Sequence, residues 1–376
     1  VAVMTQNIGA GRPGVAYQAR QLGLTFNAVL GIIVSLILTF GAGAILAGVG
    51  VADALMQPAR TYLQIVGGFC ILNALIPICS SYLRAFGFSK EPLYASIIGN
   101  VINFCLNAFF LFVLHKGVAG VATATVISRI INLVIVVLLG AVLVKAKQHP
   151  ERESNRAVMG QIIRIGLPSA CETAIYNVSM TLVIRFLNQM DAQGLNVTAR
   201  SYTMQITNFS YCVGAALAQA NAIMTGWHIG AKEYDACDRG TKKAAVIGVI
   251  VAVILETVFT LCSGWIMQLF SKDPQMVSLV GKLLAIDIVL EIGRVTNLVY
   301  GQALKTSGDA VFPVVMGACF MILCSVGGTY LFGIRLGLLA VGAYIGMTGD
   351  ECVRAVGMYL RWKSGKWKEK GLVKSR

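Results

Sequence analysis

Long apolar runs separated by short polar loops fill this chain from end to end. Each run is long enough to cross about 30 Å of hydrocarbon as a helix. Ten such runs can be marked, at 22–47, 61–83, 93–114, 118–144, 160–187, 202–227, 243–270, 277–303, 310–333 and 337–361. The pattern predicts an all-α, polytopic membrane protein with about ten transmembrane helices.

The runs form two copies of one pattern. Landmark residues recur at a spacing of 221, as in the pairs Gly9–Gly230, Ala10–Ala231, Gly87–Gly308 and Pro92–Pro313. A duplicated bundle of apolar helices is typical of secondary transporters, whose sites lie where the repeats meet. The second copy begins near Met159, so the first would begin about 62 residues before Val1. We therefore expect two pseudo-symmetric lobes and a chain that lacks the first two helices of a twelve-helix bundle.

Composition and charge support this class. Apolar residues make up 56% of the chain, charged residues 13%, and the net charge is +14. A soluble chain would carry roughly a quarter of charged residues. The basic residues gather in alternate loops, and the other loops, such as 188–201, carry one each. The positive-inside rule then predicts a plasma-membrane protein with both chain ends in the cytoplasm. The basicity thus sets topology and gives no reason to expect nucleic-acid binding.

The polar segments divide the chain into four predicted parts. Residues 1–144 form an incomplete N-terminal lobe of about four helices, 145–158 a cytoplasmic linker, 159–361 a C-terminal lobe of six helices and 362–376 a basic cytoplasmic tail. The tail is expected to be solvated or to face lipid. Pro77 lies inside the second run and is expected to kink that helix unless neighbouring groups satisfy the carbonyl that it frees.

Two common site types are not expected. Gly9–Gly14 matches a dinucleotide fingerprint in its letters, but no strand–helix–strand pattern surrounds it, so we interpret it as a turn between helices. The ten cysteines are scattered without a Cys-x-x-Cys pair, and the three histidines lie in loops or at run ends. This spacing favours neither a disulfide framework nor a zinc site.

Ionisable residues inside the apolar runs are the best candidates for function, since they are costly to keep in a membrane. Asp287, Glu291 and Arg294 share one helix face by their spacing of four and three. They can form a cation or proton site, or Glu291 and Arg294 can form an internal ion pair that fixes helix packing. Asn297, one turn further, can add an uncharged ligand. Their counterparts in the first copy are uncharged, which separates them from the shared scaffold.

Two more carboxylates lie in other runs. Glu172 follows Pro168 by one turn, so carbonyls freed by the proline can help it hold a cation, or it can cap its own helix near the membrane surface. Glu256 has no charge within four residues, so either another helix supplies a partner or the carboxyl stays protonated. Near the middle of the last run, Glu351 and its charged neighbours Asp350 and Arg354 are expected to form a structural pair.

Aromatic and methionine side chains in the runs have two interpretations. Most such residues face lipid or neighbouring helices. Tyr176, Met180 and Tyr211 are candidates to line a cavity for aromatic cations, where cation–π contacts would help binding.

Paired motifs resemble the multidrug and toxic compound extrusion (MATE) family of drug/cation antiporters. The resemblance rests on Ile8-Gly9-Ala10-Gly11 with Ile229-Gly230-Ala231, on Leu83-Arg84-Ala85-Phe86-Gly87 with the stretch 304–309, and on Gly166-Leu167-Pro168-Ser169. It implies two six-helix lobes around a V-shaped cleft, alternating access, and export coupled to Na⁺ or H⁺.

The prediction that follows is a secondary active antiporter, not an enzyme, that exports drugs or amphipathic organic cations. Glu172, Asp287 and Glu291 would hold the coupling Na⁺ or H⁺, supported by Arg294, Asn297 and Glu256. No cofactor besides the coupling ion is expected, and the protein would be a monomer in contact with lipid. The alternative is a lipid-linked oligosaccharide flippase, which needs several cations in its cavity. Its candidates are Arg294, Arg129 and Arg354.

Overall fold

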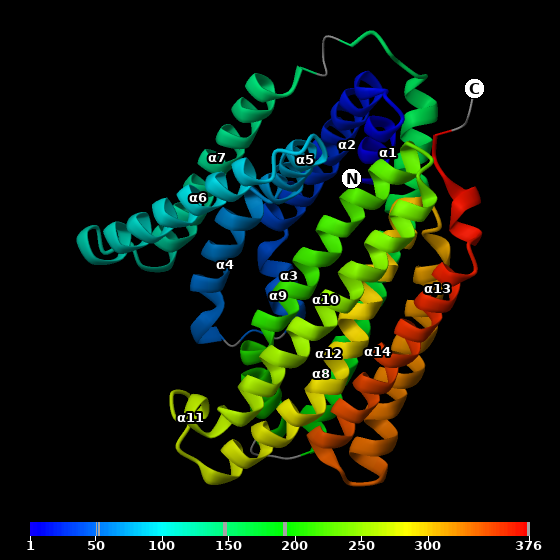
Figure 1. The fold of residues 1–376 in the computed structure, drawn as a ribbon. Helices are drawn as coiled ribbons and strands as arrows, with labels where there is room; N and C mark the ends of the chain where they lie inside the picture. Colours follow the sequence, from blue (N-terminus) through cyan, green and yellow to red (C-terminus); the bar gives the residue numbers. More distant parts are fainter. Residues whose placement is uncertain (50, 52, 146–148, 191–193, 374–376) are drawn as a thin grey trace. The chain divides into compact units, whose positions relative to one another are not determined.

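The computed structural model describes residues 1–49, 51, 53–145, 149–190 and 194–373. The described residues form helices joined by short turns, with no strand among them (Figure 1). The chain divides into two compact units, essentially residues 3–162 and residues 163–376, which we call the first and second units.

In the first unit the helix Gly117–Leu143 packs on several of the others. Its helices are α1 (Ala2–Gly9), α2 (Pro13–Phe40), α3 (Ala42–Val49), α4 (Asp53–Gly68), α5 (Ile71–Ala85), α6 (Lys90–Ala108), the π-helical turn η1 (Phe109–Val113) and α7 (Gly117–Leu143). Helix α2 packs on α4 and α5, and α7 packs on α4, α5 and α6.

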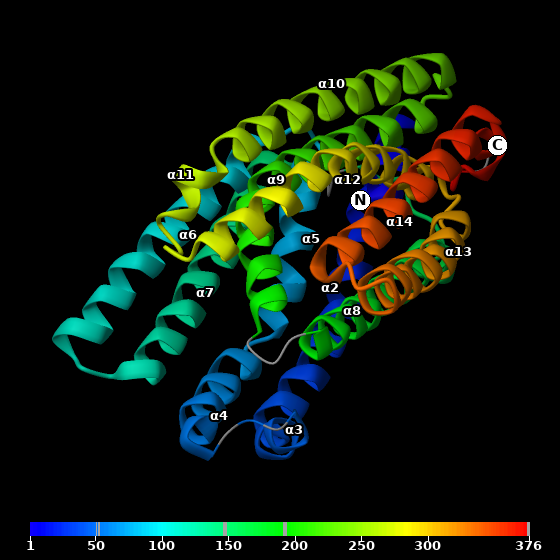
Figure 2. The same cartoon turned by 90° about the horizontal axis from the view of Figure 1, so that it is seen from below.

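The second unit has α12 at its centre. Its helices are α8 (Asn155–Met190), α9 (Leu195–Gly230), α10 (Tyr234–Leu261), α11 (Ser263–Met267), α12 (Pro274–Ser307), α13 (Val311–Phe320), the π-helical segments η3 (Met321–Val326) and η4 (Thr329–Arg335), α14 (Leu339–Lys363) and the 3₁₀ segment η5 (Lys366–Lys370). Helix α12 packs on α9, α10 and α14, as Figures 1 and 2 show. Any polar side chain on α12 is therefore offered partners from several helices.

The apolar helices fit a membrane. Among the described residues five are long and apolar enough to cross one, namely α2, α7, α10 and the continuous stretches 90–113 and 311–335, and the bent pair α4–α5 can make a sixth. The other long helices, α8, α9, α12 and α14, carry most of the buried polar side chains of the second unit. Large apolar side chains such as Phe40, Phe104 and Leu261 are exposed on the helix surfaces, where lipid would cover them. The predicted all-α, multi-pass fold is confirmed.

Helix boundaries repeat along the chain. Helices α2, α4 and α6 begin at Pro13, Asp53 and Lys90, and α10, α12 and α13 begin at the positions that the spacing of 221 assigns to them. The turns match as well: Gly87 and Gly308 both take a left-handed conformation, with φ of 89° and 100°. Glycine adopts this conformation without a steric penalty. The internal repeat inferred from sequence is thus present in the positions of helices and turns.

Two local predictions meet different outcomes. Pro77 does not interrupt its helix, because α5 continues from Ile71 to Ala85; the 41° bend lies instead at the break between α4 and α5. A proline is tolerated inside a helix where neighbouring groups satisfy the freed carbonyl, which is the exception attached to the prediction. The glycine-rich segment after α1 is a turn, as predicted, with Gly11 at a φ of 70°.

The linker and the tail lie partly outside the described residues, namely at 146–148 and 374–376. In the described part of the linker, Glu153 pairs with Arg12 at 2.5 Å and its carbonyl accepts a hydrogen bond from Gln18. In the described part of the tail, Trp367 is buried and stacks on Trp362 at 4.1 Å, whereas Lys363, Lys366 and Lys368 are exposed. The expectation of a solvated or lipid-facing segment therefore holds for these lysines and not for the tryptophans. The division at 1–144, 145–158, 159–361 and 362–376 stays a prediction.

Candidate functional site

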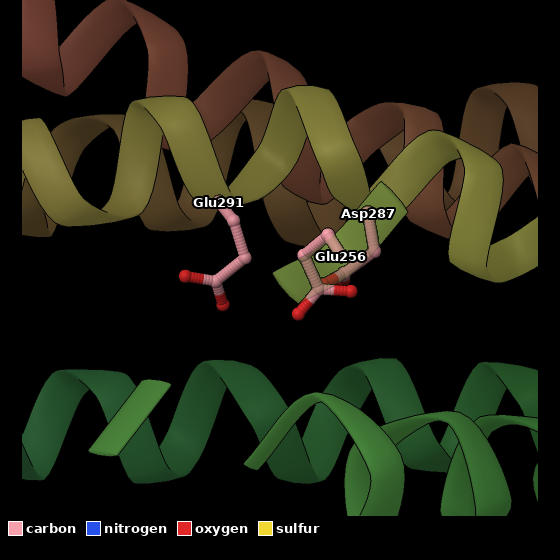
Figure 3. A group of neighbouring side chains, drawn as sticks. All are labelled: Glu256, Asp287 and Glu291. Atoms are coloured by element: carbon pink, nitrogen blue, oxygen red, sulfur yellow. The ribbon is translucent and has the colours of Figure 1, made fainter. Parts of the chain in front are cut away.

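A buried group of carboxyls lies between α10 and α12. Asp287 and Glu291, one turn apart on α12, meet Glu256 from α10, and one oxygen of each lies within 4.8 Å of the others. Figure 3 shows the three side chains directed toward the same space. The exposed fraction is 2% for Asp287 and 0% for both Glu291 and Glu256. We call Glu256, Asp287 and Glu291 the acid cluster.

Several polar atoms of the acid cluster have no hydrogen-bond partner. Both carboxyl oxygens of Glu256 are unpartnered, as are Oδ2 of Asp287 and Oε2 of Glu291. Ser210 of α9 lies beside Glu256, and its buried hydroxyl is unpartnered too. A buried polar atom without a partner costs about 1–3 kcal/mol. The cluster therefore has the donor set and the unmet bonding capacity to bind a proton or a small cation.

Arg294 supplies part of the missing positive charge. Its Nη1 donates to Oε1 of Glu291, which forms the ion pair considered as the alternative to a cation site. One guanidinium offsets only one of three ionised carboxylates. The two interpretations are thus compatible, since charge for a further cation or for protons is left after the Glu291–Arg294 pair has formed.

A second polar group joins α12 to α14. Glu351 accepts a hydrogen bond from Asn297 at 3.0 Å and pairs with Arg354 at 2.9 Å. Arg354 also binds Asp350 with two nitrogens, at 2.8 and 3.0 Å. Arg294 lies 3.9 Å from Glu351, so its side chain stands between this group and the acid cluster. The side-chain amide of Asn297 is thus directed to Glu351, and Asn297 is not one of the three residues that meet in the cluster.

Two cavities open beside these groups. The larger, of about 490 Å³, is lined by Glu172, Tyr176, Lys305 and other residues of α8, α12 and α14. The smaller, of about 230 Å³, is lined by Asp287, Met180 and residues of α9. Arg294, Tyr176 and Tyr211 line both. The acid cluster therefore touches one cavity through Asp287 and lies one side chain away from the other.

The predicted trio of coupling residues separates into two places. Asp287 and Glu291 lie together, whereas Glu172 pairs with Lys305 at 2.6 Å in the larger cavity. Lys305 belongs to α12, like Glu291, but lies close to the other end of that helix. At a rise of about 1.5 Å per residue, the stretch of α12 from Glu291 to Lys305 is about 20 Å long. Glu256, predicted only as a supporting residue, takes the third place in the cluster.

The predicted cavity residues all line cavities. Tyr176 and Tyr211 border both, and Met180 borders the smaller. Sequence reasoning missed Lys305, which resembled a loop residue of the repeat, and Arg200, which was assigned to the loop 188–201. Arg200 is a buried residue of α9, since that helix already begins at Leu195. If the apolar run that starts at 202 had been extended toward the N-terminus, it would have included Arg200. No pattern in the sequence pairs Lys305 with Glu172.

Comparisons with known proteins agree with this architecture. The MatE family model matches residues 1–109 and 168–331. The "Uncharacterized transporter YisQ" of Bacillus subtilis is 32% identical over 99% of this chain and 82% of its own length. The "Probable multidrug resistance protein NorM" of Thermotoga maritima is 21% identical over 84% of this chain and 68% of its own length.

Solved structures show the same fold. A MATE crystal structure in the straight conformation superposes with a TM-score of 0.87 at 18% identity, over 98% of this chain and 83% of the other. The eukaryotic MATE transporter AtDTX14 superposes with a TM-score of 0.87, also at 18% identity and with the same coverage. At 18% identity the superpositions show the fold alone. The family model and the match to YisQ show the family. The chain belongs to the MATE family of transporters.

Proposed function

We propose that this protein is a secondary active antiporter that exports drugs or amphipathic organic cations in exchange for H⁺ or Na⁺. The observation that carries the proposal is the acid cluster, with its unpartnered oxygens and its position beside two cavities. The names of relatives point the same way, since NorM of Thermotoga maritima is called a probable multidrug resistance protein.

The coupling mechanism follows from charge. Three ionised, buried carboxylates and the guanidinium of Arg294 leave a net charge of −2, and a bound proton or Na⁺ reduces it. Binding of the coupling ion therefore lowers the electrostatic free energy of the acid cluster. If substrate prefers one conformation and the coupling ion the other, each drives the other's release by linkage.

The flippase alternative needs free cations for phosphate groups. Two of its three candidate arginines already have acidic partners: Arg294 binds Glu291, and Arg354 binds Asp350 and Glu351. A phosphate would have to break these pairs to bind. We therefore favour the antiporter, located in the plasma membrane as a monomer with both chain ends in the cytoplasm, and with neither nucleic acid nor a cofactor as partner.

Reconstitution into liposomes tests the function. We expect transport of a fluorescent organic cation to follow an imposed H⁺ gradient or an imposed Na⁺ gradient, and the gradient that drives it identifies the coupling ion. Transport under neither gradient would contradict the antiporter.

Substitutions then test the site. Glu256→Gln, Asp287→Asn and Glu291→Gln should each abolish gradient-driven transport while leaving the protein folded. The matched control is Asp238→Asn, at an acidic residue whose partners are Lys242 and Trp362 rather than the cluster. If all three cluster variants kept full coupling, the acid cluster would not be the coupling site.

A further inference from the structure

The larger cavity of the second unit holds one of the chain's own ammonium groups. Nζ of Lys305, from α12, lies 2.6 Å from Oε2 of Glu172, from α8. Both side chains line the cavity and keep partial exposure, at 15% and 17%. The cavity volume of about 490 Å³ lies within the roughly 300–1,000 Å³ range of small-molecule sites. The ammonium of Lys305 is thus paired with the carboxylate of Glu172 in a cavity that is large enough for a ligand.

Glu172 lies beside aromatic rings, and the two arginines of the same lining, Arg294 and Arg354, are already paired with other carboxylates. Tyr176 stands one turn further along α8, and Tyr211 reaches the same cavity from α9. A carboxylate beside aromatic rings binds an ammonium through charge and through cation–π contact. The other carboxylate of the lining, Glu351, is held by Asn297 and Arg354. Glu172 faces a lysine, whose flexible side chain can move away without disturbing a helix.

We propose that Glu172 binds the cationic group of an organic-cation substrate, and that Lys305 is a built-in competitor that leaves Glu172 when the substrate arrives. The ligand class is a monovalent organic cation, such as a quaternary ammonium, with an aromatic part that contacts Tyr176 and Tyr211. The inference rests on the proposed function and assigns its substrate site, separate from the acid cluster that would take the coupling ion.

The competition makes the two members of the ion pair act in opposite directions. An apparent dissociation constant equals the intrinsic constant divided by the fraction of sites that are free to bind. Removing Lys305 raises that fraction and tightens binding, whereas removing the charge of Glu172 weakens it. If the pair only held α8 to α12, both substitutions would weaken binding, and the double variant would recover part of the loss.

The test is a titration of the purified transporter with ethidium, an aromatic cation, followed by fluorescence in detergent without any gradient. We expect Lys305→Gln to lower the Kd about five- to tenfold, because most sites are then free. Glu172→Gln should raise the Kd at least about tenfold, and the double variant should resemble Glu172→Gln. The matched control is Lys242→Gln, since Lys242 also pairs at 2.6 Å, with Asp238, outside the cavity lining. It should bind ethidium like the wild type.

A measurement on the wild type covers the case in which Lys305→Gln does not fold. Ethidium binding should free the Lys305 amine, so its acetylation by acetic anhydride, followed by mass spectrometry, should become faster. Weaker or unchanged binding by a folded Lys305→Gln, or slower or unchanged acetylation of Lys305, would overturn the proposal. Efflux by the wild type distinguishes failure of this inference from failure of the proposed function. Ion-driven efflux without tighter binding by Lys305→Gln refutes only the inference. Tight ethidium binding without ion-driven efflux refutes the proposed function.

Discussion

The two units contain two copies of the same helix pattern, related by the spacing of 221. Helices α2 and α4–α5 of the first unit correspond to α10 and α12 of the second, but the copies differ in whether the later helix is continuous. In the first unit the chain breaks between α4 and α5 and bends by 41°. In the second unit the corresponding stretch, α12, is one continuous helix from Pro274 to Ser307. The residues at the break, Phe69 and Cys70, correspond to Leu290 and Glu291.

The side chains at this level differ in chemistry as well. Ser35 of α2 accepts a hydrogen bond from the backbone N–H of Ile71, at the start of α5, and so satisfies a group that the break leaves open. Its counterpart on α10 is Glu256, which meets Asp287 and Glu291 instead. At this position the first unit has a hydroxyl that accepts a backbone hydrogen bond, and the second unit has a carboxyl that belongs to the acid cluster. An unbroken α12 has no open backbone group at this level, so the carboxyls there are not needed to satisfy the backbone.

Arg294 should give the largest effect, because Arg294→Met leaves Glu291 as a buried charge without its partner. Removing one member of a buried pair costs about 3–5 kcal/mol. We expect that loss in the free energy of unfolding, measured by SDS titration in mixed micelles. The double variant Arg294→Met/Glu291→Leu should recover much of it. The counterpart in the first unit is the exposed Asn73, where Asn73→Ala should change stability by less than about 0.5 kcal/mol. Equal losses at the two positions would show that the charge pair is not what distinguishes the units.

Glu256→Ser should have the next largest effect, since it places the residue of the first unit into the second. We expect gradient-driven transport in liposomes to fall about a hundredfold, which corresponds to about 2.7 kcal/mol. The matched variant, Ser35→Ala, loses a hydrogen bond of 3.3 Å and should cost about 0.5–1.5 kcal/mol of stability. It should leave ion coupling intact. Loss of coupling in Ser35→Ala with full coupling in Glu256→Ser would reverse the roles that we assign.

Gly31 tests how closely α2 approaches the start of α5. A Cβ at Gly31 would lie 2.9 Å from Cα of Ile71, so Gly31→Ala forces the helices apart. Overpacking of this kind costs about 1–3 kcal/mol, to be read from the same SDS titration. The corresponding residue of α10 is already alanine, the buried Ala252. A neutral Gly31→Ala would mean that the bend between α4 and α5 does not depend on this contact.

Most of the fold could be predicted because helix positions depend on local pattern. The ten apolar runs each coincide with helix, and the spacing of 221 is repeated in the helix starts. The bend in the first unit could not be placed, since it lies at the break between α4 and α5, where Gly31 of α2 lies close to Ile71, and not at Pro77. Proline remains inside α5 because neighbouring groups in a bundle tolerate it.

The site could be predicted only along one helix at a time. The spacing of Asp287, Glu291 and Arg294 placed them on one face of α12, and the structure brings them together as that spacing implies. Glu256 and Lys305 required knowledge of which helices pack together, and a single sequence does not contain it. Their partners, Asp287 and Glu172, belong to other helices and are too distant along the chain for any helical period to connect them.

The turns after α1 and after α9 provide the smallest test. Gly11 and Lys232 occupy equivalent positions and both have positive φ, 70° and 63°. A left-handed conformation costs a residue with a Cβ about 1–2 kcal/mol, and glycine's greater freedom in the unfolded chain offsets part of this. Lys232→Gly should therefore stabilise the second unit by less than about 1 kcal/mol, and Gly11→Ala should destabilise the first by about 1 kcal/mol. Thermal unfolding in detergent can detect both signs. A destabilising Lys232→Gly would mean that the lysine side chain stabilises this turn by more than its backbone conformation costs, so that the two turns are equivalent in geometry but not in the interactions that maintain it.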